Sequence, residues 1–355
     1  MASHTSFDWL KISPAMPNEQ IRHAALQHQA QLTKPPGALG RLEEIAVQLA
    51  ALQHTLHPSV DHVQISIFAA DHGVATENIS AFPQAVTTEM IRNFTAGGAA
   101  INVLARTLSA QLEVINLGTV HSTDTLTNVR HYHLGAGTAN FMHTAAMNEN
   151  QLAAALNAGS TSVEQARANN QQLLIAGEMG IGNTTSATAL ACLLLNLPPA
   201  QVAGAGSGLD SKGIAHKINV IERALTLHRS HTHSSLEALR RVGGFEIAAL
   251  TGAYIRGAQL GLPLLIDGFI STVAALTAEQ ICMDSRNWFI YAHQSAEPGH
   301  AHVLKALDAI PLLDLSMRLG EGSGAAVAVN LLRMACRLHN EMATFSTAHV
   351  STRKQ

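Results

Sequence analysis

The chain has 355 residues, of which 47% are hydrophobic and only 13% are charged, and its formal net charge is −3 at pH 7. This balance excludes a disordered chain and allows one large domain or two unequal ones. Lysine and arginine form no long runs, so neither nucleic acid nor an anionic membrane surface is an expected partner.

The cysteines and the N-terminal segment indicate the compartment. Cys192, Cys282 and Cys336 lie far apart and form no Cys-x-x-Cys pair, which favours buried, reduced thiols over disulfides or structural zinc. The N-terminal segment lacks the pattern of a signal peptide, and the most apolar stretch, 187–197, is too short to span a membrane. Histidine occurs 20 times without an HExxH motif. We expect a soluble cytoplasmic protein without membrane insertion, metal or other cofactor.

The first 60 residues show helical patterns and no strand signal. Helices are predicted over Asn18–Gln31 and Ala38–Leu56, and Pro35-Pro36-Gly37 separates them. We predict that residues 1–60 form the N-terminal part of a small helical domain.

From residue 61, short apolar runs alternate with longer helical patterns. Such alternation is typical of βαβ units and a mostly parallel sheet. We therefore predict a doubly wound α/β domain over residues 61–324, with helices on both faces of the sheet and ligands at the carboxyl ends of the strands. The predicted strands are Val63–Ala70, Leu112–Leu117, Gln171–Ala176, Pro263–Ile266 and Trp288–Ala292, and the predicted helices are Gly97–Ser109, Thr184–Leu195 and Phe245–Leu260.

The C-terminal part begins with a glycine-rich loop, Arg318–Gly324, which opens a predicted helix from Ala325 to about Met342. We predict that the helix within residues 325–345 packs with the small domain and that residues 346–355 form a loose tail.

The segment Asp71–Met90, which follows the first strand, carries apolar residues where an exposed loop or helix start is expected. Phe82 and Met90 would suit the wall of an aromatic ligand site, and a dimer interface would explain them equally. The pair Asp71-His72 could hold a metal or relay a proton, but a hydrogen-bonded loop anchor is the favoured interpretation.

Two further glycine-rich segments favour nucleotide or phosphosugar binding. In Gly177–Leu190, closely spaced glycines follow a strand, and Asn183 or Thr184 can cap the next helix, whose amides then face an anion. A tight turn with glycines for packing only is the alternative, and neither the P-loop nor the dinucleotide fingerprint is present. In Gly204–Lys217, Lys217 could place a charge near phosphate, although a helical lysine is usually solvated.

Glu321 lies between Gly320 and Gly322, immediately before the C-terminal helix. An uncrowded carboxylate in this position can act as a general base. It can equally be an acid that only complements the helix dipole. The spacing alone leaves both interpretations open.

Together these segments resemble the nicotinate-nucleotide:dimethylbenzimidazole phosphoribosyltransferase family, over about residues 30–345. The motifs that carry the resemblance are KPPGALGRLE from Lys34, AADHGV from Ala69, SAFPQAVTTEMIRNFTAGGAAINVLAR from Ser80, GEMGIGNTT from Gly177, GAGSGLD from Gly204, VGGFEIAALTGA from Val242, LPLLIDGFIS from Leu262, HQSAEPGH from His293 and MRLGEGSGAA from Met317.

The resemblance implies a large parallel-sheet domain, a smaller helical domain and a homodimer. It implies transfer of 5-phosphoribose from nicotinate mononucleotide to 5,6-dimethylbenzimidazole, giving α-ribazole 5′-phosphate and nicotinate with inversion at the anomeric carbon, for the nucleotide loop of cobalamin. The family's general base falls on Glu321, and a second site glutamate falls on Glu178.

Other site residues are predicted around these two glutamates. The apolar pair at the base pocket leaves the acceptor open among benzimidazoles, purines and phenols. The predicted phosphate contacts are Gly180, Asn183, Thr184, Gly206 and Lys217, the further nucleotide contacts are Ser295, Gly320 and Gly322, and the base-pocket residues are Phe82 and Met90.

Two alternative functions have less support in the sequence. A nicotinamide-dinucleotide dehydrogenase would carry GxGxxG after its first strand, and this chain does not. A non-catalytic nucleotide-binding relative would have no need to retain Glu321 and Glu178. The single acid Asp267 in LLIDG also disfavours phosphoribosyl pyrophosphate as donor, because enzymes that use it generally carry paired acids after a strand.

Overall fold

The structure, a computed structural model, describes residues 7–351. The first six residues of the predicted N-terminal part and the last four of the predicted tail lie outside the described residues.

Within residues 7–351, six strands form one sheet in which every neighbouring pair is parallel. The spatial order is β3-β2-β1-β4-β5-β6, so the direction of winding reverses between β1 and β4. The strands are β1 Val63–Ala70, β2 Gln111–Gly118, β3 Val129–His131, β4 Leu173–Met179, β5 Leu264–Ile266 and β6 Phe289–Tyr291. In such sheets, ligands bind where the winding reverses, at the carboxyl ends of the strands.

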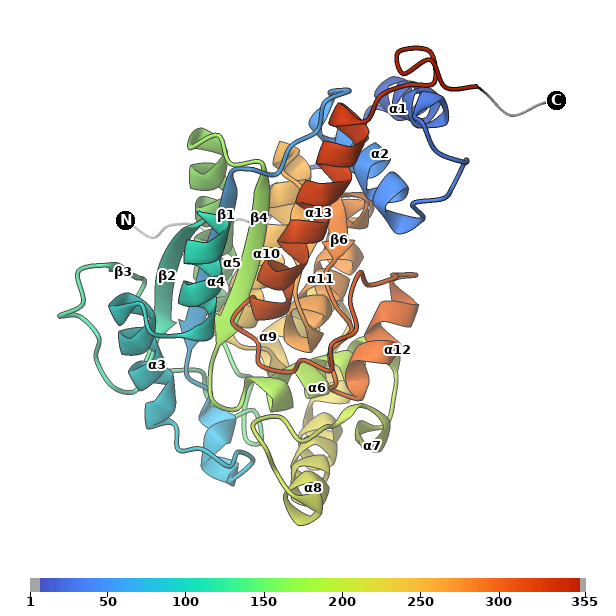
Figure 1. The fold of residues 1–355 in the computed structure, drawn as a ribbon. Coiled ribbons are helices and arrows are strands. Elements are labelled where there is room, and N and C mark those ends of the chain that lie inside the picture. Colours follow the sequence, from blue (N-terminus) through green and yellow to red (C-terminus); the bar gives the residue numbers. More distant parts are fainter. Residues whose placement is uncertain (1–6, 352–355) are drawn as a thin grey trace.

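Helices cover both faces of the sheet (Figure 1). The α-helices are α1 Glu19–Gln31, α2 Arg41–Gln53, α3 Ala85–Ala96, α4 Ala100–Leu108, α5 Glu149–Ala168, α6 Asn183–Leu195, α7 Pro199–Val202, α8 Ser211–His228, α9 Ser235–Val242, α10 Phe245–Leu260, α11 Phe269–Ile281, α12 Gly299–Ala306 and α13 Ser323–Glu341, and the 3₁₀ helices are η1 Asp8–Lys11, η2 Gly73–Glu77, η3 Arg229–His231 and η4 Ser285–Trp288.

The alternation of side chains along β1 explains the two layers. All eight residues of β1 are buried, as expected for a central parallel strand. Phe68 faces one core, which includes α5, α10 and α11, whereas Ile65 and Ile67 face the other core with α2, α4 and α13. The predicted α/β fold with helices on both faces is confirmed.

Every predicted strand and helix is present with ends that differ by a few residues, and the structure adds elements that were not predicted, among them β3 and α5. The predicted helix at Gly97 begins at Ala100, because α3 ends at Gly97 with φ +79. The C-terminal helix begins at Ser323 rather than Ala325. The second half of the segment 204–217 is helical, since Asp210 caps α8 by accepting a hydrogen bond from the Gly213 amide.

The helical N-terminal part lies beside the C-terminal helix. α13 packs on both α2 and α4, and the segment after it turns back on α1, where the Phe345 amide donates to the Gln31 carbonyl oxygen. The division into a small and a large domain stays a prediction. The three cysteines are free and buried, as predicted. None of the helices in the described part of the chain is long and apolar enough to cross a membrane.

The crossing of α5 and α10 leads to a stability prediction. A Cβ added at Gly252 would collide with the backbone of Leu156, so the two helices touch through their main chains. Gly252→Ala gains about 1 kcal/mol of helix propensity but forces the helices apart, and overpacking of this kind costs about 1–3 kcal/mol or more. We expect a net loss of unfolding free energy in urea denaturation. Asn157→Ala, on the exposed side of α5, is the control and should leave the unfolding free energy unchanged or raise it by up to about 0.7 kcal/mol.

Candidate active site

A cavity of about 440 Å³ opens at the carboxyl ends of β4, β5 and β6, beside the reversal in strand order. Its lining residues lie in the stretches 79–90, 178–184, 206–207, 267–271, 293–297 and 318–321. A mononucleotide and a flat heterocycle are of the size that such cavities hold.

Most of the predicted site residues meet in this cavity. Those that line it are Phe82, Met90, Glu178, Gly180, Asn183, Thr184, Gly206, Ser295, Gly320 and Glu321. Lys217 and Gly322 do not line it. The structure thus brings together segments far apart in the sequence, while the roles of these residues stay predictions.

Lys217 lies one layer behind the cavity wall. Its side chain is fully buried, and its Nζ donates to Thr184 Oγ1 at 2.9 Å and to the Gly204 carbonyl oxygen at 3.4 Å. Burial lowers the pKa of Lys217 to about 8, although the nearby Glu297 carboxylate raises it. In this position the ammonium group orients Thr184 and the glycine-rich loop.

The backbone from Gly320 to Gly322 has a left-handed conformation at three successive residues, with φ values of +87, +62 and +75. A Cβ at Gly320 would collide with the Glu178 side chain, and one at Gly322 would lie 2.9 Å from Ile175 Cγ2. Gly322 therefore serves the close approach of this loop to β4. Glu321 adopts a conformation that is costly for a residue with a side chain, and such strain is concentrated at functional sites.

Glu321 lines the cavity with a side chain that is almost entirely buried. Its Oε2 accepts a hydrogen bond from the Ile101 amide at 3.4 Å, at the start of α4, where the helix dipole favours negative charge. Burial raises the pKa of Glu321 above its ordinary value, and the Asp267 carboxylate adds to the rise. A raised pKa makes this carboxylate a better proton acceptor near neutral pH.

Glu178, near the end of β4, is also almost entirely buried. Its carboxyl group accepts a hydrogen bond from the Asn183 side chain. Burial raises the pKa of Glu178 to about 8, and the negative charges of Glu246, Asp267 and Glu321 contribute to the rise. Glu178 is therefore protonated at neutral pH and can donate a hydrogen bond to a ligand.

Asp267 follows β5, and His293 follows β6, so both lie at the sheet edge that carries the cavity. Asp267 Oδ1 accepts from the Ala325 amide at 2.7 Å, and His293 Nε2 lies 3.6 Å from the same oxygen. Burial raises the pKa of Asp267, while His293 and backbone amides oppose the rise. Neither residue was predicted as a site residue, although each follows a predicted strand.

His72 and Glu246 form a second buried pair that the sequence reasoning missed. His72 Nε2 lies 2.6 Å from Glu246 Oε1, and both side chains are fully buried. The favoured interpretation of Asp71-His72 as a loop anchor is incomplete, because both residues reach other segments: Asp71 Oδ2 accepts from the Val120 amide at 2.9 Å. Nothing in the local sequence pairs His72 with a residue so far along the chain.

Arg318 and Glu297 also line the cavity and were not predicted. Both hold the glycine-rich loop at Gly206: Glu297 Oε1 accepts from the Gly206 amide at 3.0 Å, and Arg318 Nη1 donates to the Gly206 carbonyl oxygen at 3.2 Å. Arg318 thereby brings a guanidinium group to the wall, where it can meet an anion. The prediction that no metal takes part stays a prediction.

The chain is similar to known proteins over almost its whole length. A phosphoribosyltransferase family model matches residues 15–350. The chain is 58% identical to a protein of Xanthomonas oryzae pv. oryzae (98% of this chain, 99% of the relative) and 56% identical to one of Pseudomonas fluorescens (97% and 98%), both named nicotinate-nucleotide–dimethylbenzimidazole phosphoribosyltransferase.

Solved structures agree as well. The fold is similar to the crystal structure of CobT from Thermus thermophilus, with a TM-score of 0.90 and 43% identity over 94% of this chain and 99% of that one. A second structure from that organism, titled as the same phosphoribosyltransferase, gives a TM-score of 0.89 and 42% identity over 95% of this chain and 100% of that one. The chain therefore belongs to the nicotinate-nucleotide–dimethylbenzimidazole phosphoribosyltransferase family.

Proposed function

We propose that the protein transfers 5-phosphoribose from nicotinate mononucleotide to 5,6-dimethylbenzimidazole, forming α-ribazole 5′-phosphate and nicotinate for the nucleotide loop of cobalamin. The observation that carries the proposal is the convergence of Glu321 and Glu178 on one cavity that has an anion-binding end and an apolar wall. The names of the similar proteins support the same substrates.

The phosphate binds at the start of α6. Gly180, Asn183 and Thr184 line the cavity there, at the N-terminus of a helix whose dipole favours an anion. Arg318 supplies a positive charge on the wall, and Lys217 supports Thr184 from behind. Together these groups hold the dianionic end of the mononucleotide.

The acceptor base lies against the apolar wall. Ile79 and Phe82 line the cavity from the segment between η2 and α3, and Val86 and Met90 line it from α3. A flat heterocycle packs well on such side chains. Because these four side chains are apolar and form no hydrogen bonds that would select one base, purines and phenols are the competing acceptors to test.

The reaction needs one base and no acid at the leaving group. The nicotinate ring nitrogen carries a positive charge in the mononucleotide, so the C–N bond electrons leave with a ring that becomes neutral at that nitrogen. Negative charge at the site stabilises the oxocarbenium-like anomeric carbon. Attack by a benzimidazole nitrogen from the opposite face inverts β to α, and Glu321 then accepts the proton from the other ring nitrogen.

The two glutamates have different tasks. Glu178, with a pKa of about 8, stays protonated and positions the ligand as a hydrogen-bond donor. Glu321 accepts a hydrogen bond from the Ile101 amide at the start of α4, where the helix dipole favours the negative charge that a base requires. Neighbouring carboxyl groups whose environments separate their pKa values typically divide acid and base roles in this way.

Glu321→Gln should lower turnover by about 10²–10⁴-fold, with little change in the Michaelis constant for nicotinate mononucleotide, because the amide keeps the shape but accepts no proton. The assay is chromatographic detection of α-ribazole phosphate, with benzimidazoles, adenine and phenols compared as acceptors. The control is Glu89→Gln, on the exposed side of α3, which should retain turnover. Unchanged turnover in Glu321→Gln would place the base elsewhere, and absence of product from wild type would remove the proposed reaction.

The raised pKa of Glu178 predicts a pH dependence of stability. An unfolded glutamate ionises near pH 4.5 and the folded one near 8, so its stabilising proton is lost as the pH rises toward 8. Burial lowers the pKa of His300, so this residue opposes the trend only below pH 6.5, the ordinary pKa of histidine. Between pH 6.5 and pH 8 the unfolding free energy of the wild-type protein should fall by up to about 2 kcal/mol, and that of Glu178→Gln should fall by less.

Urea denaturation of the wild-type protein and of Glu178→Gln at several pH values between 6.5 and 8 measures how the unfolding free energy of each depends on pH. Parallel stability curves for wild type and Glu178→Gln would show that Glu178 is already ionised in the folded protein, and its role as a proton-bearing group would then be wrong.

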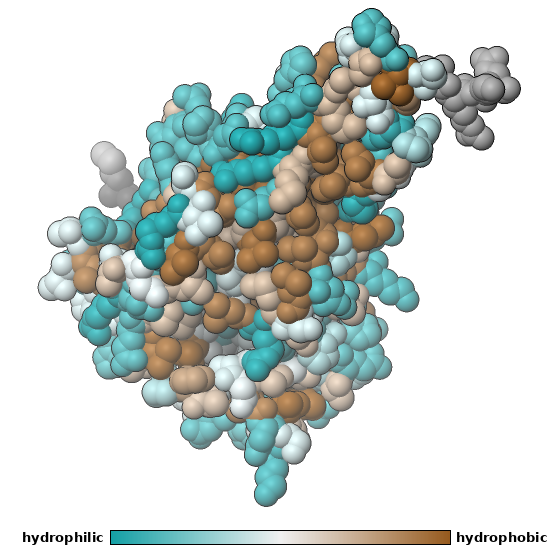
Figure 2. All heavy atoms as spheres, in the orientation of Figure 1, coloured by the Kyte–Doolittle hydropathy of each residue, from teal (hydrophilic) through white to brown (hydrophobic). Residues whose placement is uncertain are grey.

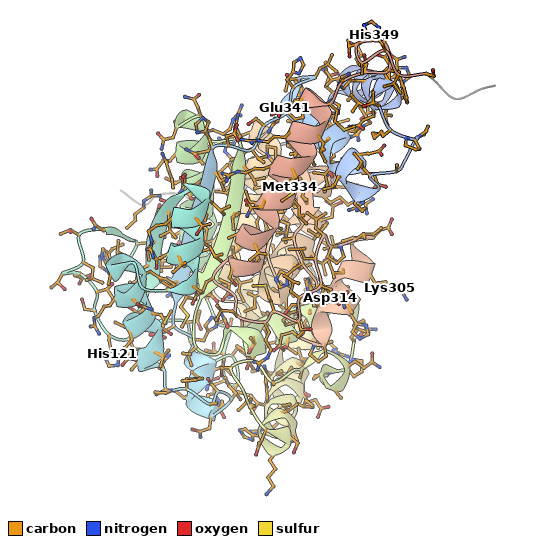
Figure 3. The ribbon with its side chains drawn as sticks, viewed as in Figure 1. His121, Lys305, Asp314, Met334, Glu341 and His349 are labelled. Atoms are coloured by element: carbon orange, nitrogen blue, oxygen red, sulfur yellow. The ribbon has the colours of Figure 1, made fainter. Side chains whose placement is uncertain are left out.

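We also propose a cytoplasmic homodimer that does not bind nucleic acid, consistent with the net charge of −3. Hydrophobic residues gather across the face that carries α4 and α13 (Figure 2). Among them, Val103 on α4 is 50% exposed and Met334 on α13 (Figure 3) is 53% exposed. A second copy of the chain would cover this surface.

Sedimentation velocity tests the dimer. Met334→Glu introduces a charge into the proposed interface and should shift the protein toward the monomer. Met283→Glu is the matched control and should remain dimeric. Met283 is 75% exposed and belongs to neither α4 nor α13. A wild-type protein that sediments as a monomer at all concentrations would contradict the proposal.

A further inference from the structure

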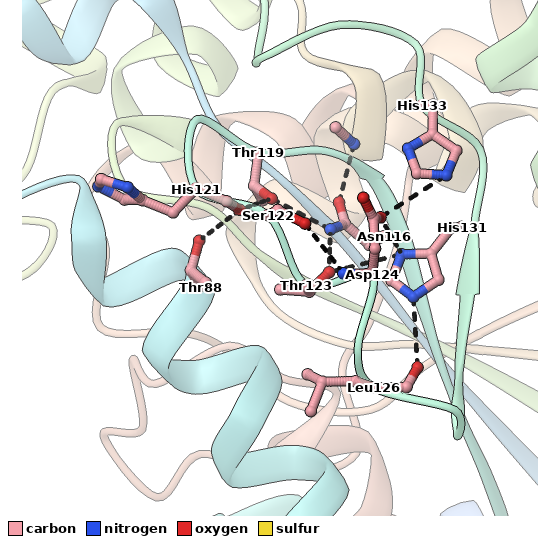
Figure 4. A network of polar contacts seen from close by, with 11 residues as sticks. Thr88, Asn116, Thr119, His121, Ser122, Thr123, Asp124, Leu126, His131 and His133 are labelled. Atoms are coloured by element: carbon pink, nitrogen blue, oxygen red, sulfur yellow. Dashed lines mark hydrogen bonds and ion pairs between the residues drawn. The ribbon is translucent and has the colours of Figure 1, made fainter.

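Two histidines and an aspartate converge at the carboxyl end of the edge strand β3 (Figure 4). His131 is the last residue of β3, His133 follows two positions later, and Asp124 lies in the loop between β2 and β3. Asp124 Oδ1 lies 3.8 Å from His131 Nδ1 and 3.7 Å from His133 Nε2. The two imidazole rings are stacked, with centroids 5.6 Å apart.

The spacing of these three ligand atoms suits one metal ion. All three lie within 4.8 Å of one another. Ligands of a tetrahedral zinc ion, each about 2.1 Å from the metal, lie about 3.4 Å apart. Because the Asp124 and His133 side chains are 61% and 67% exposed, rotations of these two side chains can close the remaining difference.

A hydrogen bond behind His131 prepares that ring for coordination. His131 Nε2 lies 3.3 Å from the Leu126 carbonyl oxygen. Since a carbonyl only accepts, Nε2 carries a proton, and Nδ1 of the neutral ring is then free of a proton. Nδ1 lies 3.4 Å from Thr123 Oγ1 and 3.8 Å from Asp124 Oδ1, so an ion bound there replaces the hydroxyl contact. A backbone carbonyl in this position is the usual support of a ligating histidine. The loop itself is held by Asn116, whose Nδ2 donates to Thr123 Oγ1 at 2.7 Å.

A second cavity adjoins the cluster. It has a volume of about 250 Å³, and Asp124 and His133 line it together with Asn116 and Thr119. None of the three cluster residues lines the larger cavity that holds Glu321. The space leaves room for water to complete the coordination of an ion held by three protein ligands.

We propose that Asp124, His131 and His133 bind a divalent first-row transition-metal ion of the Zn²⁺ type. Two imidazole nitrogens favour such ions, whereas Mg²⁺ and Ca²⁺ require oxygen ligands. The ion joins the loop between β2 and β3 to the end of β3. Thr88 of α3 donates to the His121 carbonyl oxygen in the same loop at 3.3 Å. By stabilising this loop, the ion also stabilises α3, the helix that carries Met90.

Isothermal titration of metal-stripped, full-length protein with Zn²⁺ tests the proposal. Wild type should show one saturable site that the double variant His131→Gln/His133→Gln weakens at least about tenfold. Asp124→Asn, an exposed and nearly isosteric change, should weaken it as well. The matched control is His231→Gln/His233→Gln, which removes an exposed pair of the same His-x-His spacing and should leave the site intact. In the described part of the chain, that pair belongs to no group of three such ligands.

Two further measurements make the result unambiguous. Zn²⁺ should raise the melting temperature of wild type and of the control but not of His131→Gln/His133→Gln, and Mg²⁺ should raise none of them. If the cluster is only an exposed ion pair between imidazolium and carboxylate, wild type and His131→Gln/His133→Gln will titrate identically with Zn²⁺. That result, or equal loss of the site in both double variants, would overturn the proposal.

Discussion

The organisation of this protein depends on four carboxyl groups that lie close together at the carboxyl edge of the sheet, largely removed from water. Glu178 feels the charges of Glu246, Asp267 and Glu321, and burial disfavours ionisation at this site. Each group is stabilised separately, and none has a lysine or arginine ion pair among the described residues. Glu246 meets His72, Asp267 meets the Ala325 amide and His293, Glu178 meets Asn183, and Glu321 meets the Ile101 amide.

This arrangement has a direct chemical consequence. A site with an excess of carboxyl groups and few cations retains protons on its most buried members and favours positive charge in whatever binds there. In the complex that we propose, a mononucleotide with a cationic ring satisfies that requirement at one end, while its phosphate lies at the helix N-terminus and Arg318 at the other. The charges of the cavity would then match the two ends of the proposed substrate.

The backbone is adapted to the same constraint. Gly320 lets the loop pass the Glu178 side chain, and Gly322 lets it approach β4 at Ile175. Glu321 is held between them at a φ of +62, and its amide bonds to the Glu178 carbonyl oxygen at 3.3 Å. The two glutamates thus occupy fixed relative positions because main chain, rather than flexible side chains, joins their segments.

Local sequence determined the strands, the main helices and the position of most site residues. The segment β1 forms a strand because a mainly apolar run of this length, interrupted only by Gln64 and Ser66, suits a sheet buried on both faces. Glycines between polar residues mark backbone that a ligand can approach. Only the tertiary structure decided that Lys217 is buried behind the cavity, that His72 pairs with Glu246, and that Asp124 meets two histidines. Helix and strand periodicity reports near neighbours along the chain. It carries no information on which distant segments pack together, and that packing sets burial, charge and ligand geometry.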